Sequence, residues 1–337
     1  MQPFFYVTAK IIMLSYSQIA EIIEAEISQI DFDLSPRELF EPIRYTLALG
    51  GKRIRPVLTL IACNIFDGNI EKAVNPALGM EVFHNFTLLH DDLMDQADKR
   101  RRQPTVHKKW NTNTAILSGD AMLIAAYRLI GATAEPYLKS ILQLFSQTAL
   151  EICCGQQYDM AFEKRATVTE DEYFEMIRLK TAVLIACCLK AGAITGGAPC
   201  MDADRLYRFG IFTGLAFQLQ DDLLDVYGNT ETFGKNLGGD ILCNKKTFLL
   251  INAINLADHQ QKKAMDFFMN PSHTFTPEEK IQTFTEIYNQ LNIRYITQQR
   301  INGLYTLAMD ELNRLETNQA ALTELKNYCS RLIQREF

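Results

Sequence analysis

Residues 84–95 decide how this chain is interpreted, and they read His84-Asn85-Phe86-Thr87-Leu88-Leu89-His90-Asp91-Asp92-Leu93-Met94-Asp95. Residues four and seven positions apart lie on one face of an α-helix, so His84, Asp91 and Asp95 form a stripe. Neighbouring carboxylates repel each other unless a cation lies between them. Mg²⁺ is held by one or two carboxylates and keeps its other positions for water and phosphate oxygens. The stretch therefore predicts a helix that ends at a metal and phosphate site.

The same spacing returns 130 residues later, where Asp221, Asp222 and Asp225 end a second largely apolar segment. A single Asp-Asp-x-x-Asp cluster is more often a solvated helix face than a metal site. Two clusters with equal internal spacing favour two helices that face each other across a shared metal–diphosphate cluster.

The rest of the chain predicts an all-α fold. Of its 337 residues 47% are hydrophobic, with only 17 glycines and 10 prolines. Each strongly periodic segment has the helical period, and no strand or hairpin pattern competes. We expect one helical domain over residues 13–337. Residues 1–12, apolar with one lysine, form a leader that is either a signal or an overlong gene start.

Several helix boundaries are marked in the sequence. Capping boxes begin at Ser35, Thr169 and Thr276, and each combines a hydroxyl side chain with a glutamate three residues later. Glycines and a proline between residues 192 and 199 precede a long apolar segment at about 202–227.

The net charge indicates which binding partners are excluded, and the cysteines indicate the cellular compartment. The net charge of -6 gives no general affinity for nucleic acid or anionic membranes. Adjacent cysteines at 153–154 and 187–188 lie in apolar helical stretches, which predicts buried reduced thiols and a cytoplasmic protein. Lys190, Asp120 and Arg128 interrupt the apolar runs, so we expect no transmembrane segment.

Four basic motifs accompany the carboxylates, and each has an alternative interpretation. Gly50-Gly51-Lys52-Arg53-Ile54-Arg55-Pro56 suits a phosphate, or is a helix C-terminus that favours cations. Residues 99–102 are four consecutive cations, which fit a diphosphate clamp better than a nucleic-acid patch because no aromatic residues are interleaved. Lys180-Thr181 lies in an apolar helix, where the lysine is either a ligand or a snorkelling side chain. Glycines and lysines at 234–246 follow Asp225 and could be ordinary loop residues.

In this order and spacing, the motifs resemble the trans-isoprenyl diphosphate synthases, and the resemblance covers residues 35 to 330. It implies a bundle of long helices around a deep central cavity, and usually a homodimer. Members of this family join isopentenyl diphosphate head-to-tail to an allylic diphosphate. The alternatives are a terpene cyclase, whose second cluster would mix Asn, Ser and Glu, and a non-catalytic subunit of a heteromeric synthase, which would lose carboxylates.

The resemblance implies a role for each matching residue. Three Mg²⁺ ions would be held by Asp91, Asp95 and Asp221, with Asp92 and Asp225 as supporting residues. These metal ligands act with Lys180 and Lys235 in ionising the allylic substrate. Contacts to the allylic diphosphate or its metals are implied for Arg100, Lys180, Thr181, Gln218, Lys235 and Lys245. Those to isopentenyl diphosphate are implied for Lys52, Arg55, His84 and Arg101. No side chain is assigned as general base, because the released pyrophosphate would take the final proton.

Two positions bear on specificity. The family commonly has a glycine where this chain has Arg102, which leaves the division of roles among the three arginines open. An aromatic residue five positions before the first aspartate, here Phe86, resembles the cavity floor of short-chain enzymes, with Phe83 and Thr87 close by. We expect a product of fifteen or twenty carbons.

Overall fold

The computed structural model describes residues 14–228, 237–317 and 319–333, and within them the protein is helical apart from one short hairpin. The leader at 1–12 and Lys235 lie outside the described residues. The elements, in chain order, are α1 (Tyr16–Gln29), α2 (Arg37–Ala48), α3 (Ile54–Phe66), α4 (Glu71–Met94), β1 (Lys99–Arg100), β2 (Gln103–Pro104), α5 (Val106–Lys109), α6 (Thr112–Gly131), α7 (Leu138–Glu163), α8 (Glu170–Ile177), the π-helix η1 (Arg178–Ala182), α9 (Val183–Thr195), α10 (Cys200–Tyr227), α12 (Gly239–Leu242), α13 (Phe248–Leu256), α14 (His259–Met269), α15 (Pro277–Gln290), α16 (Ile293–Asn313) and α17 (Gln319–Ile333).

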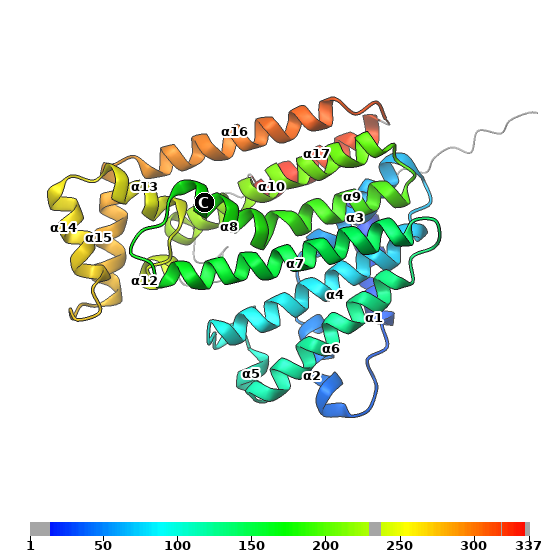
Figure 1. Cartoon of the computed structure of the whole chain (residues 1–337), viewed down its shortest axis with the longest axis horizontal. Coiled ribbons are helices and arrows are strands. Elements are labelled where there is room, and N and C mark those ends of the chain that lie inside the picture. The colour runs from blue at the N-terminus through cyan, green and yellow to red at the C-terminus, as the bar shows by residue number, and fades with distance from the viewer. Residues whose placement is uncertain (1–13, 229–236, 318, 334–337) are drawn as a thin grey trace, which may run out of the picture.

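The long helices form the body of the molecule. In Figure 1, α4, α7, α9, α10 and α16 run roughly along its long axis, and the short helices α12 to α15 gather at one end. The most extensive contacts join α4 to α6, α10 to α16, and α9 to both α3 and α10. This arrangement confirms the predicted all-α fold, and it brings the ends of α4 and α10, where the two aspartate clusters lie, toward the short helices.

The predicted helix boundaries are confirmed at three of four places. Thr169 and Thr276 form complete capping boxes, and the predicted segment at 202–227 is α10. The capping box at Ser35 is wrong. Pro36 occupies the N-cap position of α2 with extended backbone and no side-chain cap, so Ser35 lies one residue too early to cap the helix.

The expectation of no hairpin is also wrong, because β1 pairs with β2 in an antiparallel register. Arg101 and Arg102 form the turn between them, with φ of 51° and 67°. Two-residue hairpin turns require positive φ at both positions and usually carry Asn and Gly. Arginines in these positions gave no recognisable turn pattern in the sequence.

The two cysteine pairs differ. Cys187 and Cys188 are buried as predicted, whereas Cys153 and Cys154 are exposed. Helix α7 buries Ile152 and Gly155 on its inner face, which leaves the two residues between them outside. The interpretation of that pair as buried was wrong, because apolar composition alone did not identify the inner face.

One helix of the described chain is long and apolar enough to cross a membrane, namely α6. The charges of Asp120 and Arg128 do not exclude it, contrary to the expectation from the sequence. A third of its apolar window is buried, and the helix packs against α4. A core helix of a soluble bundle meets the same criteria, so this helix is weak support for a membrane span.

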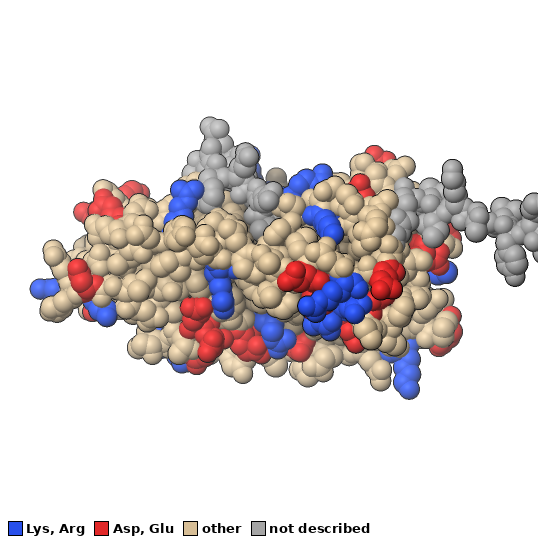
Figure 2. Space-filling view, turned by 90° about the horizontal axis from the view of Figure 1, so that it is seen from above, with Lys and Arg blue, Asp and Glu red and all other residues tan. Residues whose placement is uncertain are grey.

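The face carrying α16 shows how charges are distributed. Figure 2 shows Lys and Arg interspersed there with Asp and Glu, without an extended area of one sign. Arg208, for example, donates a hydrogen bond to Glu311, with 2.9 Å between Nη2 and Oε2. Paired charges of this kind give the face no basic stripe that could follow a nucleic-acid backbone.

Candidate active site

The first aspartate cluster ends α4, and the hairpin folds back onto it. Asp92 is buried, and Arg100 Nε lies 2.8 Å from both of its carboxylate oxygens. Arg100 Nη2 is 3.9 Å from Asp91 Oδ2. Asp95 is the C-cap of α4, and its backbone N–H donates to the carbonyl of Asp91. The hairpin therefore places a guanidinium beside the first aspartates, while Asp91 keeps an oxygen turned toward α7.

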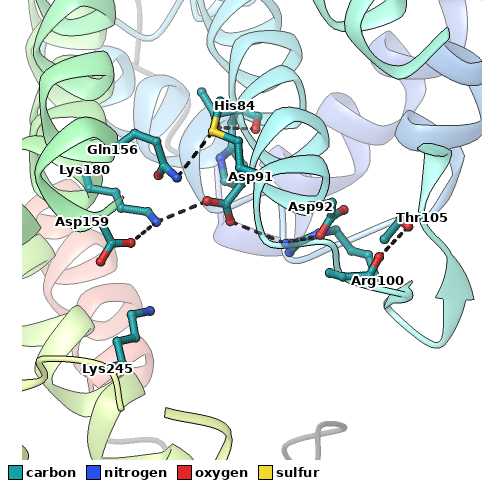
Figure 3. A network of polar contacts seen from close by, with 12 residues as sticks. His84, Asp91, Asp92, Arg100, Thr105, Gln156, Asp159, Lys180 and Lys245 are labelled. Carbon is teal, nitrogen blue, oxygen red and sulfur yellow. Dashed lines mark hydrogen bonds and ion pairs between the residues drawn. The ribbon is translucent and has the colours of Figure 1, made fainter. Parts of the chain in front are cut away.

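Lys180 bridges two carboxylates on the other side of Asp91. Its Nζ lies 3.2 Å from Asp91 Oδ1 and 2.6 Å from Asp159 Oδ2 on α7 (Figure 3). The lysine lies in η1, and π-helical turns are frequent at functional sites. Gly155 allows this approach, because a Cβ there would lie 2.4 Å from the Lys180 backbone nitrogen. The charges thus alternate across the site from α4 to η1 to α7.

A hydrogen-bonded chain leads from η1 to the second cluster on α10. Thr181 Oγ1 donates to Gln218 Oε1 at 3.0 Å, and Gln218 Nε2 donates to Asp222 Oδ1 at 2.9 Å. The hydroxyl of the buried Tyr173 donates to the other oxygen of Asp222. Burial, followed by the charge of Asp240, raises the pKa of Asp222 to about 7. Asp222 therefore serves as an acceptor within the protein, while Asp221 and Asp225 lie on other faces of the helix.

Lys245 approaches the same space from the loop after α12, below Asp159 and Lys180 in Figure 3. Although burial opposes its charge, the negative charges of Asp240, Asp159, Asp222 and Asp91 raise the pKa of Lys245. Lys245 Nζ lies 3.8 Å from Asp240 Oδ1 of α12. The first cluster is joined to η1 by the contact between Asp91 and Lys180, and η1 is joined to the second cluster through Thr181, Gln218 and Asp222. The structure thus brings both clusters to one site, as the sequence predicts.

The donor set around α4 fits a hard cation. Burial, followed by the charge of Asp91, raises the pKa of Asp95, so its charged form is favoured only with a cation nearby. Among the described residues no three His, Cys, Asp or Glu side chains converge to hold a metal by themselves. Mg²⁺ needs only one or two carboxylates when phosphate oxygens and water complete its shell. The sequence predicts Asp91, Asp95 and Asp221 as its oxygen donors, and this assignment stays a prediction.

A second group of cations lies along α4, one to two turns before the aspartates. Burial, and then the charges of Arg55, Arg101, Arg100 and Arg53, lower the pKa of His84 well below its ordinary value. The imidazole is therefore neutral at physiological pH. The Nε of Arg55 is buried without a partner among the described residues. Together these groups form a second basic cluster, called the His84 cluster, which consists of His84, Arg55 and Arg101.

Arg53 is bound to acidic side chains of α1 and α4 and is not counted in the His84 cluster. It is 6% exposed, and its guanidinium donates to Glu24, Glu81 and the carbonyl of Leu47, each at 2.9 Å. The sequence predicts no site role for Arg53, which lies between the predicted ligands Lys52 and Arg55. In the structure its guanidinium joins the loop before α3 to α1 and α4.

The predicted floor residues lie on α4 before Asp91. Phe86 is half-buried, and its ring centroid lies 5.5 Å from that of the buried Phe83. Phe83 in turn contacts Phe145 of α7 edge-on, at 5.1 Å between ring centroids. Thr87 donates to the carbonyl of His84. Aromatic rings thus occupy the space toward the N-terminus of α4, and the predicted deep central cavity stays a prediction.

Three residues of the site were missed from the sequence. Asp159, Tyr173 and Glu81 each bind a residue that the motifs identified, namely Lys180, Asp222 and Arg53. The succession Gly155-Gln156-Gln157-Tyr158-Asp159, with a glycine one turn before a carboxylate, was the only indication for Asp159. Tyr173 and Glu81 gave none, since each lies in an ordinary helical pattern.

A family model described as polyprenyl synthetase matches residues 36–289. The chain belongs to this family. The geranylgeranyl diphosphate synthase of Methanosarcina mazei is 37% identical over 267 residues, which is 78% of this chain and 81% of the relative. A solved geranylgeranyl pyrophosphate synthase is 40% identical with a TM-score of 0.87, covering 95% of this chain and 98% of that one. The corresponding synthetase of Pyrococcus horikoshii is 30% identical with a TM-score of 0.88 and the same coverage.

Membership makes the protein a prenyltransferase with the isoprenoid synthase fold. The match begins at α2 and ends in α15, so it includes both aspartate clusters, the π-helix and the Lys245 loop. The comparisons favour neither the terpene cyclase nor the non-catalytic subunit.

Proposed function

We propose that the protein condenses isopentenyl diphosphate head-to-tail with an allylic diphosphate and releases a trans-prenyl diphosphate of fifteen or twenty carbons together with pyrophosphate. The observation that carries this proposal is the alternation of Asp91, Lys180, Asp159 and Lys245 across the space between α4 and α10. Such an alternation provides cations for a diphosphate and carboxylates for the metals that accompany it. The geranylgeranyl diphosphate synthases that the chain resembles support the product class.

The basic residues at this site act on the leaving group. When the allylic C–O bond breaks, negative charge builds up on the departing pyrophosphate, and Lys180, Lys245 and Arg100 place positive charge beside it. Lys235, which lies outside the described residues, and Thr181 with Gln218 would contribute further contacts. Mg²⁺ bound at Asp91, Asp95 and Asp221, three ions in all, would supply Lewis-acid neutralisation of the diphosphate. Asp92 and Asp225 support this arrangement by binding Arg100 and the backbone of Asp240.

The His84 cluster would bind the second substrate, isopentenyl diphosphate. Lys52, Arg55 and Arg101 bring three cations to the diphosphate of isopentenyl diphosphate, and a neutral His84 can donate one hydrogen bond to it. Binding there directs the double bond of isopentenyl diphosphate toward the allylic cation. A new C–C bond then forms, and loss of a proton to the released pyrophosphate creates the new double bond.

The test is a Mg²⁺-dependent incubation of the purified protein with isopentenyl diphosphate and, separately, dimethylallyl, geranyl and farnesyl diphosphate. Products are resolved by chain length after dephosphorylation. We expect elongation that stops at fifteen or twenty carbons and disappears when Mg²⁺ is chelated. No elongation from any starter would contradict the proposal.

We also propose a cytoplasmic homodimer formed through the outer faces of α6 and α7. On α6, Leu117 and Ile124 lie seven residues apart and are 59% and 62% exposed, and Leu150 of α7 is 61% exposed. A surface of this kind is typical of a protein interface. A second copy of the chain supplies a matching surface through twofold symmetry. Light scattering should give twice the chain mass, and Leu117→Glu with Ile124→Glu should give the monomer.

A further inference from the structure

The segment that presents Lys245 is fastened on one side to α10. The backbone N–H of Gly238 donates to the carbonyl of Asp225 at 2.7 Å, and that of Asp240 donates to Asp225 Oδ2 at 3.0 Å. These bonds tie the beginning of α12 to the second aspartate cluster. They leave the other end of α12 and the loop that follows it, at residues 243–247, to be held by something else.

Lys280 of α15 holds that other end. Its side chain reaches the carbonyl oxygen of Leu242, the last residue of α12, with Nζ at 3.1 Å, and the Oδ1 of Asn244 at 2.7 Å. The residue is 2% exposed, and the described residues place no carboxylate within ion-pair distance of it. Burial lowers the pKa of Lys280. A buried ammonium without a counter-ion is unfavourable, so its two oxygen partners, together with the ring of Phe275 at 5.7 Å from Nζ, make the position tolerable.

Asn244 connects this bond to Lys245. Its backbone has φ of 54°, a left-handed conformation that turns the chain at this residue. After the turn, the N–H of Lys245 donates to the carbonyl of Asp240 at 2.9 Å, and the side chain points toward Asp159 and Lys180. The Asn244 side chain accepts from Lys280 at 2.7 Å and donates from Nδ2 to the carbonyl of Met269 at 3.5 Å. The shorter of these contacts, with Lys280, sets the orientation of Asn244 and with it the point from which Lys245 enters the site.

The apolar face of α15 accounts for its packing without Lys280. Phe284, Ile287 and Tyr288 are buried in the core beside α13 and α16, and Ile281 packs directly on Gly238. Burial of this area stabilises the helix by the hydrophobic effect. A charged group buried beside such a face adds little to packing. We therefore expect Lys280 to act on the loop at residues 243–247, which it binds.

We propose that Lys280 is a positioning residue that orients Lys245 toward the allylic diphosphate, although it lies outside the site and does not contact the substrate. This inference rests on the proposed function. It gives α15, a helix to which no sequence motif assigns a role, the function of supporting the loop that carries Lys245.

The experiment compares Lys280→Met with Lys263→Met, which replaces an exposed lysine on α14, and with Asn244→Ala, which removes one acceptor and keeps the buried lysine. For each variant the KM for geranyl diphosphate, the KM for isopentenyl diphosphate and the Tm are measured in the presence of Mg²⁺. Lys280→Met and Asn244→Ala are then made in the Lys245→Ala background, so that coupling between Lys280 and Lys245 is measured directly.

We expect Lys280→Met to raise the KM for geranyl diphosphate about tenfold, to leave that for isopentenyl diphosphate within twofold, and to have less than a twofold effect in the Lys245→Ala background. Asn244→Ala should act in the same direction, which keeps the inference testable if Lys280→Met does not fold. Equal increases for both substrates, or an undiminished effect without Lys245, would overturn it. A wild-type protein that elongates no starter would refute the proposed function instead.

Discussion

Gly51 lies directly against the guanidinium of Arg101. A Cβ built on Gly51 would stand 2.6 Å from Arg101 Nη2, and the glycine has φ of 143°. This contact joins the loop before α3 to the tip of the hairpin, two segments that the sequence separates by 50 residues. It places the guanidinium of Arg101 in the His84 cluster, where isopentenyl diphosphate is proposed to bind.

Gly51→Ala should therefore displace Arg101 and raise the KM for isopentenyl diphosphate by about tenfold or more, because small displacements of a positioned charge have large effects. The KM for the allylic substrate should stay within twofold. Gly50→Ala is the matched control, since Gly50 also has positive φ but no atom lies within 4 Å of the place that its Cβ would take. Similar KM values for the two variants would show that backbone strain alone matters.

The two arginines in the hairpin turn have different surroundings, and we expect them to have different roles. The charge of Arg101 contributes to lowering the pKa of His84 and lies at Gly51, whereas Arg102 occupies a left-handed turn position with φ of 67°. We expect Arg101→Ala to raise the KM for isopentenyl diphosphate and Arg102→Ala to leave it unchanged. The opposite result would move the ligand role by one residue.

Arg102→Gly should raise stability by about 1 kcal/mol, and Tm by about 2 °C, because glycine adopts this conformation without strain.

Local patterns accounted for most of the fold and for half of the site. Both aspartate clusters and three of the four predicted helix boundaries follow from helical period and capping residues, which involve neighbours within one or two turns. Asp159 and Glu81 could not be found in this way, because their partners lie 21 and 28 residues away and only packing brings them together. The hairpin was missed because it also depends on contacts between distant residues. Arg100 binds Asp92 and Arg101 lies against Gly51, and these contacts overcome the unfavourable positive φ of the turn.

The partner of Lys180 gives the next prediction. Asp159→Asn keeps the shape of the side chain but removes the charge that lies 2.6 Å from the lysine. Because hydrogen bonds between charged groups contribute about 1.5–3 kcal/mol, we expect kcat to fall between tenfold and a hundredfold. Asp266→Asn, at an exposed position of α14, serves as the control. An unchanged kcat would mean that Asp91 alone is sufficient to orient Lys180.

The cysteines test the exposure of α7. Burial raises the pKa of Cys63 to about 11 and that of Cys187 to about 12, so at pH 8 these thiols are almost entirely protonated and inert. In the monomeric Leu117→Glu, Ile124→Glu variant, where no dimer interface covers α7, iodoacetamide should modify the four exposed cysteines first, and all eight after unfolding, as read by peptide mass spectrometry. The exposed set is Cys153, Cys154, Cys200 and Cys243. Modification of Cys187 as fast as Cys154 would contradict this assignment of the faces of α7.

The aromatic residues before Asp91 are the predicted floor that limits product length. Phe86 is half-buried and contacts Phe83, and the ring of Phe83 contacts Phe145 of α7 edge-on. A growing chain directed toward the N-terminus of α4 would meet Phe86 first. Phe86→Ala removes that ring while the one behind it stays in place.

We therefore expect Phe86→Ala to lengthen the main product by one or more five-carbon units, with elongation then stopped by Phe83 and Phe145. Chromatography of the dephosphorylated products checks this, and Phe267→Ala, which truncates an exposed ring of α14, is the control. If Phe86→Ala left the product length unchanged and Phe145→Ala increased it, the floor would lie on α7. The depth reached by the chain would then be set by the packing between α4 and α7, since Phe83 and Phe145 meet there edge-on.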